Sequence, residues 1–260
     1  MATSLLIGCS RKSDQSMDNN QGGEMCNIET GICSPIEKSS DKVQSRVKNT
    51  NVLNITYYYD PLCGWCYGFS KVVSQLTDHY GDSLNLNIVS GGLFTGNRVG
   101  LVNNIAPYIK AGAYRSVEST TGVKFGDAFL DDINGNGKIE LNSVPPSIAF
   151  CIVKEAYPDH EIDFAKTLLD AVYRDGANPS DLDAYKPYID AIGMDWQKFI
   201  SKMGQTKYLE MAQAEFNTFR KSGLGGMPSL VMYQDDNAVL LTNGYATFQS
   251  LKLKIASAMD

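Results

Sequence analysis

The sequence has few histidines, no basic clusters and no long apolar run. Its 260 residues include two histidines, His79 and His160, both in polar surroundings, and we expect both at the surface. Neither has a sequence context that places it beside a cysteine, which disfavours a cysteine–histidine protease dyad. Because no stretch of about 18 apolar residues occurs, the sequence also predicts no membrane-spanning helix.

The chain has fewer basic residues than acidic residues. There are 23 lysines and arginines against 29 aspartates and glutamates, which gives a formal net charge of -6. The basic residues do not gather with aromatic residues, so the composition argues against a nucleic-acid surface. The hydrophobic fraction of 43% allows a sizeable core, in one large domain or two small ones. A soluble protein that acts on proteins or small thiols fits this composition better than a nucleic-acid-binding protein.

Among the six cysteines, two form a Cys-x-x-Cys motif, Cys63-Gly64-Trp65-Cys66. Alternating residues over 52–59 predict a β-strand before it, and apolar residues at helical spacing over 69–80 predict a helix that begins near Cys63. At a helix N-terminus, free backbone N–H groups and the helix dipole favour a thiolate. The motif therefore predicts a redox dithiol in which Cys63 is the nucleophile and Cys66, one turn further on, is the resolving thiol.

The rest of the chain predicts the strands and helices that surround this dithiol. A second strand over 84–89 completes a strand–helix–strand unit. The residues from 97 to 223 are predominantly helical in pattern, and Glu215 alone breaks the apolar face of the last helix, over 208–219. Strand patterns return over 229–233 and 239–242, and a closing helix covers 248–255. The predicted order is β-α-β, a helical insertion, then β-β-α.

This order, the position of the dithiol and the segment 225–228 resemble the DsbA family of thiol–disulfide oxidoreductases. The run from Asp60 to Phe69 is most similar to the FrnE-like branch, whose members are described as predicted protein disulfide isomerases. The resemblance covers about 51–260 and implies an α/β fold. In it, a thioredoxin-like domain over 51–96 and 224–260 carries a helical insertion over 97–223.

The resemblance also implies roles for individual residues. Pro228 falls on the family's cis-proline, which leaves the Met227 backbone available to a substrate peptide. Trp65 either contributes to an apolar platform for unfolded substrates or packs against the helical insertion. The dipeptide Gly64-Trp65 departs from better-known members, and reduction potentials in this superfamily run from about -120 to -270 mV. The direction of electron flow is therefore open, with oxidase or isomerase activity favoured over reductase activity, and no cofactor is expected.

The N-terminus predicts export. The run Leu6-Ile7-Gly8-Cys9 resembles the lipobox of bacterial lipoprotein signal peptides, in which the cysteine is lipidated. We therefore expect a lipoprotein signal remnant over 1–9, a lipid anchor at Cys9 and a location in the periplasm or cell envelope rather than the cytoplasm. The alternative is an ordinary flexible N-terminus. Residues 10–50 are polar and small, as in a flexible linker.

Three further features have several interpretations. Cys26 and Cys33, in the linker, could form a local disulfide, an auxiliary redox pair or part of a metal site. Cys151 lies among apolar residues on a predicted helix and is expected to be a buried core thiol. The segment 132–140 mimics the start of an EF-hand loop, but Ser143 stands at the twelfth position, where a bidentate carboxylate is needed. There we predict a hairpin turn and no metal.

Two other functional classes compete with the oxidoreductase. One is a glutathione-dependent transferase or isomerase of the same inserted fold, whose members commonly carry serine at the position of Cys63 and have no use for Cys66. The other is a soft-metal carrier that uses Cys63 and Cys66, with or without Cys26 and Cys33. The presence of both thiols in one motif favours the oxidoreductase.

Overall fold

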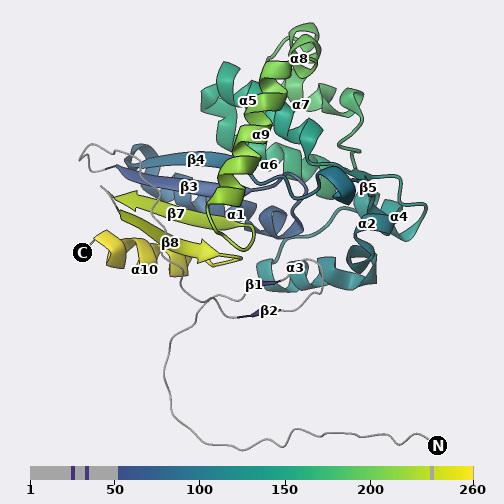
Figure 1. The fold of residues 1–260 in the computed structure, drawn as a ribbon. Coiled ribbons are helices and arrows are strands. Elements are labelled where there is room, and N and C mark those ends of the chain that lie inside the picture. The colour runs from purple at the N-terminus through teal and green to yellow at the C-terminus, as the bar shows by residue number, and fades with distance from the viewer. Residues whose placement is uncertain (1–24, 27–32, 35–51, 235–236, 260) are drawn as a thin grey trace, which may run out of the picture.

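A four-stranded sheet with the order β4-β3-β7-β8 lies at the centre of the molecule (Figure 1). The computed structural model describes residues 25–26, 33–34, 52–234 and 237–259. The predictions for Cys9, for residues 1–9 and for most of the linker lie outside these residues. The central strands are β3 (Leu53–Tyr59), β4 (Leu84–Ser90), β7 (Ser229–Gln234) and β8 (Asn237–Asn243). β3 and β4 are parallel and the other neighbours are antiparallel, as the order β-α-β then β-β-α requires.

Both faces of β3 are covered, which explains its wealth of apolar residues. Helix α1 (Gly64–Tyr80) follows the motif and packs on one face, where the Phe69 and Tyr57 rings lie 5.8 Å apart. The closing helix α10 (Phe248–Met259) joins α1 in the same core through Leu251. On the opposite face Tyr58 contacts Phe219 from the last inserted helix, with ring centroids 5.9 Å apart. The sheet is therefore the middle layer of three.

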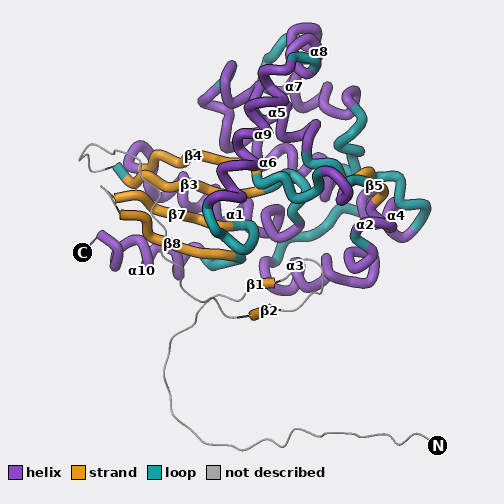
Figure 2. The backbone as a smooth tube through the Cα atoms, viewed as in Figure 1, coloured by secondary structure: helices purple, strands orange, loops and turns teal. Residues whose placement is uncertain are grey.

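The chain between β4 and β7 is mostly helical, as predicted (Figure 2). Its α-helices are α2 (Val102–Ile105), α3 (Tyr114–Thr121), α4 (Asp127–Asn134), α5 (Val144–Ala156), α6 (Glu161–Tyr173), α7 (Lys186–Ala191), α8 (Trp196–Met203) and α9 (Thr206–Lys221). Short 3-10 turns cover 81–83, 96–98, 158–160 and 182–185, and a π-helical turn covers 109–113. Helix α5 is at the centre of this part, because every residue from 148 to 153 is buried. Cys151 is among them, which confirms its prediction as a core thiol.

The hairpin predicted over 132–140 is wrong. Asp132 is part of α4, and the chain then enters the short strand β6 (Glu140–Leu141), which pairs with β5 (Gly100–Leu101) instead of folding back on itself. The Asp132 carboxylate accepts the backbone N–H groups of Lys138 and Ile139, at 2.8 and 3.1 Å. These two hydrogen bonds stabilise the turn between α4 and β6. Of the two histidines, His79 is exposed as expected, whereas His160 is half-buried.

Charged side chains cover the outer edge of β4. The Ile88 N–H donates to Glu161 Oε1 at 3.2 Å, and the Ser90 N–H donates to Glu215 Oε2 at 2.8 Å. Lys154 donates to the Ile88 carbonyl and forms ion pairs with both glutamates, at 3.2 and 3.4 Å. Glu215 therefore interrupts the apolar face of α9 because it bonds to an edge strand whose backbone groups would otherwise lack partners.

A second two-stranded pair, besides β5 and β6, lies outside the central sheet. The two-residue strands β1 (Met25–Cys26) and β2 (Cys33–Ser34) are antiparallel, with Cys26 directly opposite Cys33.

In the part of the chain that the structure describes, every helix is too short or too polar to cross a bilayer.

Candidate active site

Cys63 is the N-cap residue of α1, as the sequence predicts. Its Sγ accepts the backbone N–H of Cys66 at 3.3 Å, where capping residues usually place an oxygen. The sulfur of Cys63 therefore lies at the N-terminus of α1, where backbone N–H groups lack partners within the helix. Cys63 retains 6% exposure and Cys66 none, so Cys63 is the thiol that an incoming group can reach.

The segment that precedes β7 also lies beside Cys63. The peptide bond between Met227 and Pro228 is cis, and the Met227 carbonyl oxygen lies 3.6 Å from Cys63 Sγ. Gly91, at the end of β4, makes room for this segment, because a Cβ there would lie 2.2 Å from Met227 Sδ. The structure thus brings Cys63, Met227 and Pro228 together from segments that are 164 residues apart in sequence.

The two other residues of the motif lie beside these groups. Gly64 and Trp65 form the first turn of α1, and both are half-buried. The Trp65 ring packs against the main core while part of it stays in contact with solvent. That position is compatible with both roles expected for Trp65.

Asp60 is a site residue that sequence reasoning missed. Its carboxylate is fully buried and accepts the Leu62 N–H at 2.9 Å, the Ser143 hydroxyl at 2.9 Å and the Leu93 N–H at 2.7 Å. Burial raises the pKa of Asp60, and these donors oppose the shift. The carboxylate ties the dithiol loop to the segment after β4 and to the start of α5. The motif 60–66 contains the aspartate, but its distant partners give no sequence signal.

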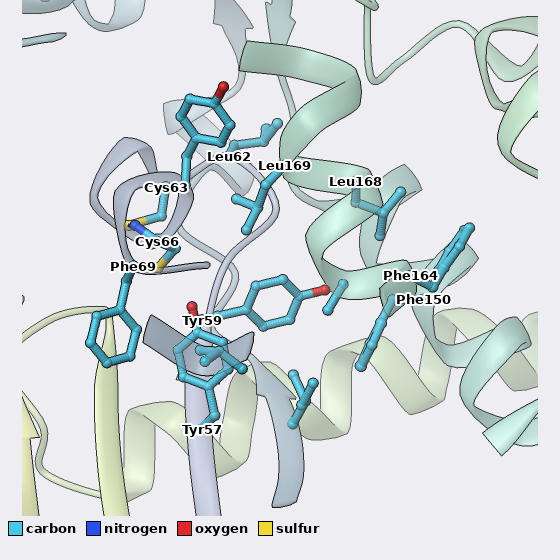
Figure 3. Close-up of a cluster of buried hydrophobic side chains, with 14 of the residues drawn as sticks. Tyr57, Tyr59, Leu62, Cys63, Cys66, Phe69, Phe150, Phe164, Leu168 and Leu169 are labelled. Atoms are coloured by element: carbon cyan, nitrogen blue, oxygen red, sulfur yellow. The ribbon is translucent and has the colours of Figure 1, made fainter. Parts of the chain in front are cut away.

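The resolving thiol lies in an apolar environment with phenols beside it. Burial raises the pKa of Cys66 well above its ordinary value, and the adjacent Cys63 raises it further. Tyr57 and Tyr173 both lie near the sulfurs, and the Tyr173 hydroxyl donates to the Leu62 carbonyl. Figure 3 shows the Tyr57 side chain reaching from β3 toward Cys66. The pair therefore consists of a reachable, helix-capped thiol and a buried one that does not readily ionise.

A polar group borders the reachable thiol. Tyr108 is 42% exposed, and burial raises its pKa, while Arg98 lowers it and Cys63 raises it. Tyr108 is therefore within electrostatic range of both Arg98 and Cys63. Sequence reasoning singled out neither residue, because both come from the irregular start of the helical insertion.

Searches by sequence found only distant relatives. No family model matches the chain. The ClpXP adapter protein SpxH of Halalkalibacterium halodurans is 23% identical over 224 residues, which cover 85% of this chain and 70% of the relative. SpxH of Shouchella clausii is 20% identical, with 82% and 67% covered. At these identities, sequence similarity does not place the chain in a family.

Solved structures are more informative. A protein of Nitrosomonas europaea, named as a candidate protein disulfide isomerase, superimposes with a TM-score of 0.69 at 22% identity over 80% of this chain and 98% of its own. The chain has the DsbA-like fold. The cytosolic disulfide reductase DsbM of Pseudomonas aeruginosa (TM-score 0.60, 22% identity, 80% and 98% covered) shares this DsbA-like fold. So does a probable DsbA oxidoreductase of Streptomyces coelicolor (0.58, 14%, 80% and 90%). The predicted α/β architecture, a thioredoxin fold with inserted helices, is confirmed.

Proposed function

We propose that this protein is a thiol–disulfide oxidoreductase that acts on protein substrates through Cys63 and Cys66. The observation that carries the proposal is the placement of Cys63 Sγ, which caps α1 at 3.3 Å from the Cys66 N–H and lies 3.6 Å from the Met227 carbonyl. A nucleophilic thiolate, a second thiol one helical turn away and a free backbone segment beside them are the parts that disulfide exchange needs.

The exchange would proceed in two displacements. The Cys63 thiolate attacks one sulfur of a substrate disulfide, so that a mixed disulfide forms and the other substrate sulfur leaves as a thiolate. Cys66 then loses its proton and attacks Cys63 Sγ, which closes the Cys63–Cys66 disulfide and releases the second substrate thiolate. The released thiolates take up two protons, and two electrons pass from the dithiol to the substrate. An oxidase runs the same steps in reverse.

The substrate would lie across Met227, Pro228 and Trp65. In this proposal the Met227 backbone holds an extended substrate segment by hydrogen bonds, and the exposed part of Trp65 contacts its apolar side chains. We favour oxidation or isomerisation of exported proteins, with anchoring through Cys9 in the cell envelope. DsbM, described as a cytosolic reductase, shares the fold, so the direction of electron flow needs measurement.

Equilibrium measurements on the full-length protein in glutathione buffers test this function, with tryptophan fluorescence as the signal. A two-electron transition near about -120 mV would support a disulfide-forming oxidant, and one near about -270 mV a reductase. The Cys66→Ser variant should accumulate a mixed disulfide between Cys63 and a substrate peptide that carries a disulfide, whereas Cys151→Ala, which alters a buried thiol in α5 and keeps Cys66, should not. If no reversible transition appears, the oxidoreductase function is rejected.

The alternatives predict different outcomes. HCCA isomerase has the same fold, with a TM-score of 0.54, and a transferase or isomerase of that kind would keep its activity in Cys66→Ser. A soft-metal carrier would retain copper or zinc on purification. Across the residues that the structure describes, no three His, Cys, Asp or Glu side chains converge on a metal site.

A second candidate, an adapter function, is favoured by the similarity to SpxH over 85% of the chain. An adapter works by binding, so its partner should still be captured by the double variant Cys63→Ser/Cys66→Ser. An oxidoreductase would lose its activity in that variant.

We also propose a disulfide between Cys26 and Cys33. Directly opposed residues in an antiparallel pair have Cα atoms about 4.5–5.5 Å apart, within the range that a disulfide bridges. Mass spectrometry of the unreduced protein after proteolysis would identify the linked peptide. Free thiols at both positions in the oxidised protein would contradict this pairing.

A further inference from the structure

Four groups that can carry a charge or a proton face Cys66. They are Cys63 from the start of α1, Asp60 from the loop before it, Tyr57 from β3 and Tyr173 from α6. The apolar side chains of the main core fill the remaining surroundings. Ionisation of Cys66 therefore depends on what these four groups can offer its sulfur.

Three of the four are already engaged. The Asp60 carboxylate accepts from two backbone N–H groups and the Ser143 hydroxyl. The Tyr173 hydroxyl donates to the Leu62 carbonyl. Cys63 Sγ accepts the Cys66 N–H and becomes part of the mixed disulfide during exchange. None of these three side chains has a free donor for a thiolate at Cys66, which leaves the Asp60 backbone N–H, a group that lowers the pKa of Cys66, as the donor they provide.

Tyr57 differs from them. Its side chain is 3% exposed, and its hydroxyl is buried without a hydrogen-bond partner among the described residues. A buried hydroxyl without a partner destabilises the folded state, so its retention calls for an explanation. Figure 3 shows this hydroxyl directed toward Cys66, with the ring fixed between Phe69 and Tyr59.

We propose that Tyr57 donates a hydrogen bond to Cys66 Sγ once that sulfur becomes a thiolate, and that it thereby sets the rate at which mixed disulfides are resolved. The inference rests on the proposed exchange at Cys63. A thiolate is a much stronger acceptor than a thiol, so the bond forms during the resolving step.

The proton of Tyr57 stays on its oxygen throughout. Burial raises the pKa of Tyr57 well above its ordinary value, so the phenol acts as a donor and not as a base. In the step, Cys66 gives its proton to solvent and its sulfur bonds to Cys63 Sγ. The bond from Cys63 to the substrate sulfur breaks, and the departing thiolate takes up a proton.

Loss of this hydrogen bond should slow the resolving step. Removing the donor should raise the pKa of Cys66 and lower its thiolate fraction about tenfold at a pH below that pKa. Thiolate nucleophilicity rises with pKa with a Brønsted slope of about 0.4–0.5, which partly offsets the lower thiolate fraction. Because the raised pKa of Cys66 lies above neutral and mildly alkaline pH, Tyr57→Phe should resolve mixed disulfides about threefold more slowly throughout that range.

Tyr59→Phe is a matched control. Tyr59 lies two residues along the same strand, is fully buried, and also has a hydroxyl without a partner among the described residues. In Figure 3 its hydroxyl points away from the two sulfurs. Both substitutions remove a buried hydroxyl from a phenyl ring, and only one of them removes a group that faces Cys66.

The experiment uses the reduced full-length protein and less than one equivalent of an aromatic disulfide that releases a coloured thiolate. Stopped-flow absorbance follows a first release, when Cys63 is modified, and a second, when Cys66 resolves. The Cys66→Ser variant, which should lack the second phase, identifies it.

A second phase about threefold slower in Tyr57→Phe than in the parent protein at neutral and mildly alkaline pH, with the rate of Tyr59→Phe unchanged, would support the inference. Equal rates for Tyr57→Phe and the parent would overturn it, as would equal slowing in the two phenylalanine variants. Absence of a second phase in the parent protein itself would instead reject the proposed function.

Discussion

At the residue scale, the unusual feature of this site is a carboxylate that is fully buried yet bonded on both oxygens. Asp60 connects the dithiol loop to Leu93 and to Ser143, which lie 33 and 83 residues further along the chain. An asparagine can replace one accepting oxygen but presents an N–H₂ group to donors on the other side. The geometry of the loop before Cys63 therefore depends on the second oxygen.

We expect Asp60→Asn to lower the free energy of unfolding by about 2 kcal/mol, because at least one buried donor loses its acceptor. The substitution should also change the pH dependence. Since burial raises the pKa of Asp60, the folded protein holds a proton that the unfolded chain has already lost, so stability falls as pH rises from about 4 through the folded pKa. That fall should be smaller in Asp60→Asn, measured by urea unfolding across this range.

Two other carboxylates define the controls for this measurement. Burial also raises the pKa of Glu215, which leaves part of the pH-dependent fall in place in Asp60→Asn. Arg174 lowers the pKa of Asp175, so its titration lies below about pH 4 and Asp175→Asn should not alter the slope above it. An unchanged slope in Asp60→Asn would contradict the assignment.

At the scale of elements, β4 is an edge strand whose outward backbone groups form hydrogen bonds with side chains, where a central strand would bond to another strand. Glutamates from α6 and α9 accept its outward N–H groups, and Lys154 from α5 donates to its carbonyl. Three helices of the insertion therefore complete the hydrogen bonding of the sheet. This arrangement fixes how the helical part sits on the thioredoxin-like part.

We expect Glu215→Leu to destabilise the protein by about 2–3 kcal/mol, although leucine suits the apolar face of α9. The Ser90 N–H and the Lys154 ammonium would both lose a mostly buried partner. Glu215→Gln keeps an acceptor for Ser90 and should lose less. Urea unfolding would measure both changes, and wild-type stability in Glu215→Leu would show that the edge contacts contribute nothing.

At the scale of the whole molecule, one buried core runs through the sheet and the helical insertion. It joins β3, α1, α5, α6 and α9 without a break. The two tryptophans sample the two parts, since Trp65 lies in α1 and Trp196 stacks on Phe199 in α8. A shared core implies that the parts unfold together.

The single-tryptophan variants Trp65→Phe and Trp196→Phe test this expectation. In each variant the remaining tryptophan reports urea unfolding, and the two midpoints should be equal. Circular dichroism of both variants measures any change in stability that a substitution itself causes, and this change is subtracted before the midpoints are compared. Two separate midpoints within either variant, one by fluorescence and one by circular dichroism, would show that the parts unfold independently.

The separation of interacting residues along the chain explains which features could be predicted from the sequence. The strand over 53–59, the helix capped by Cys63 and the order of the elements along the chain follow from local periodicity, and the resemblance implied the thioredoxin-like fold. The bonds of Asp60 and the role of Glu215 could not be predicted, because their partners are brought close only by the fold. The hairpin over 132–140 was wrong for a related reason: β6 pairs with β5, which lies 39 residues earlier along the chain.

The covered edge of β4 also limits how copies of this protein can associate. A sheet with two open edges can add strands on both sides and grow into a filament. Here, within the described residues, the other edge of the central sheet is β8, where Leu240 is 43% exposed. Because side chains already bond the outer groups of Ile88 and Ser90 in β4, β8 offers the longer run for strand addition between copies, and a pair of molecules joined there about a two-fold axis would use that edge in both.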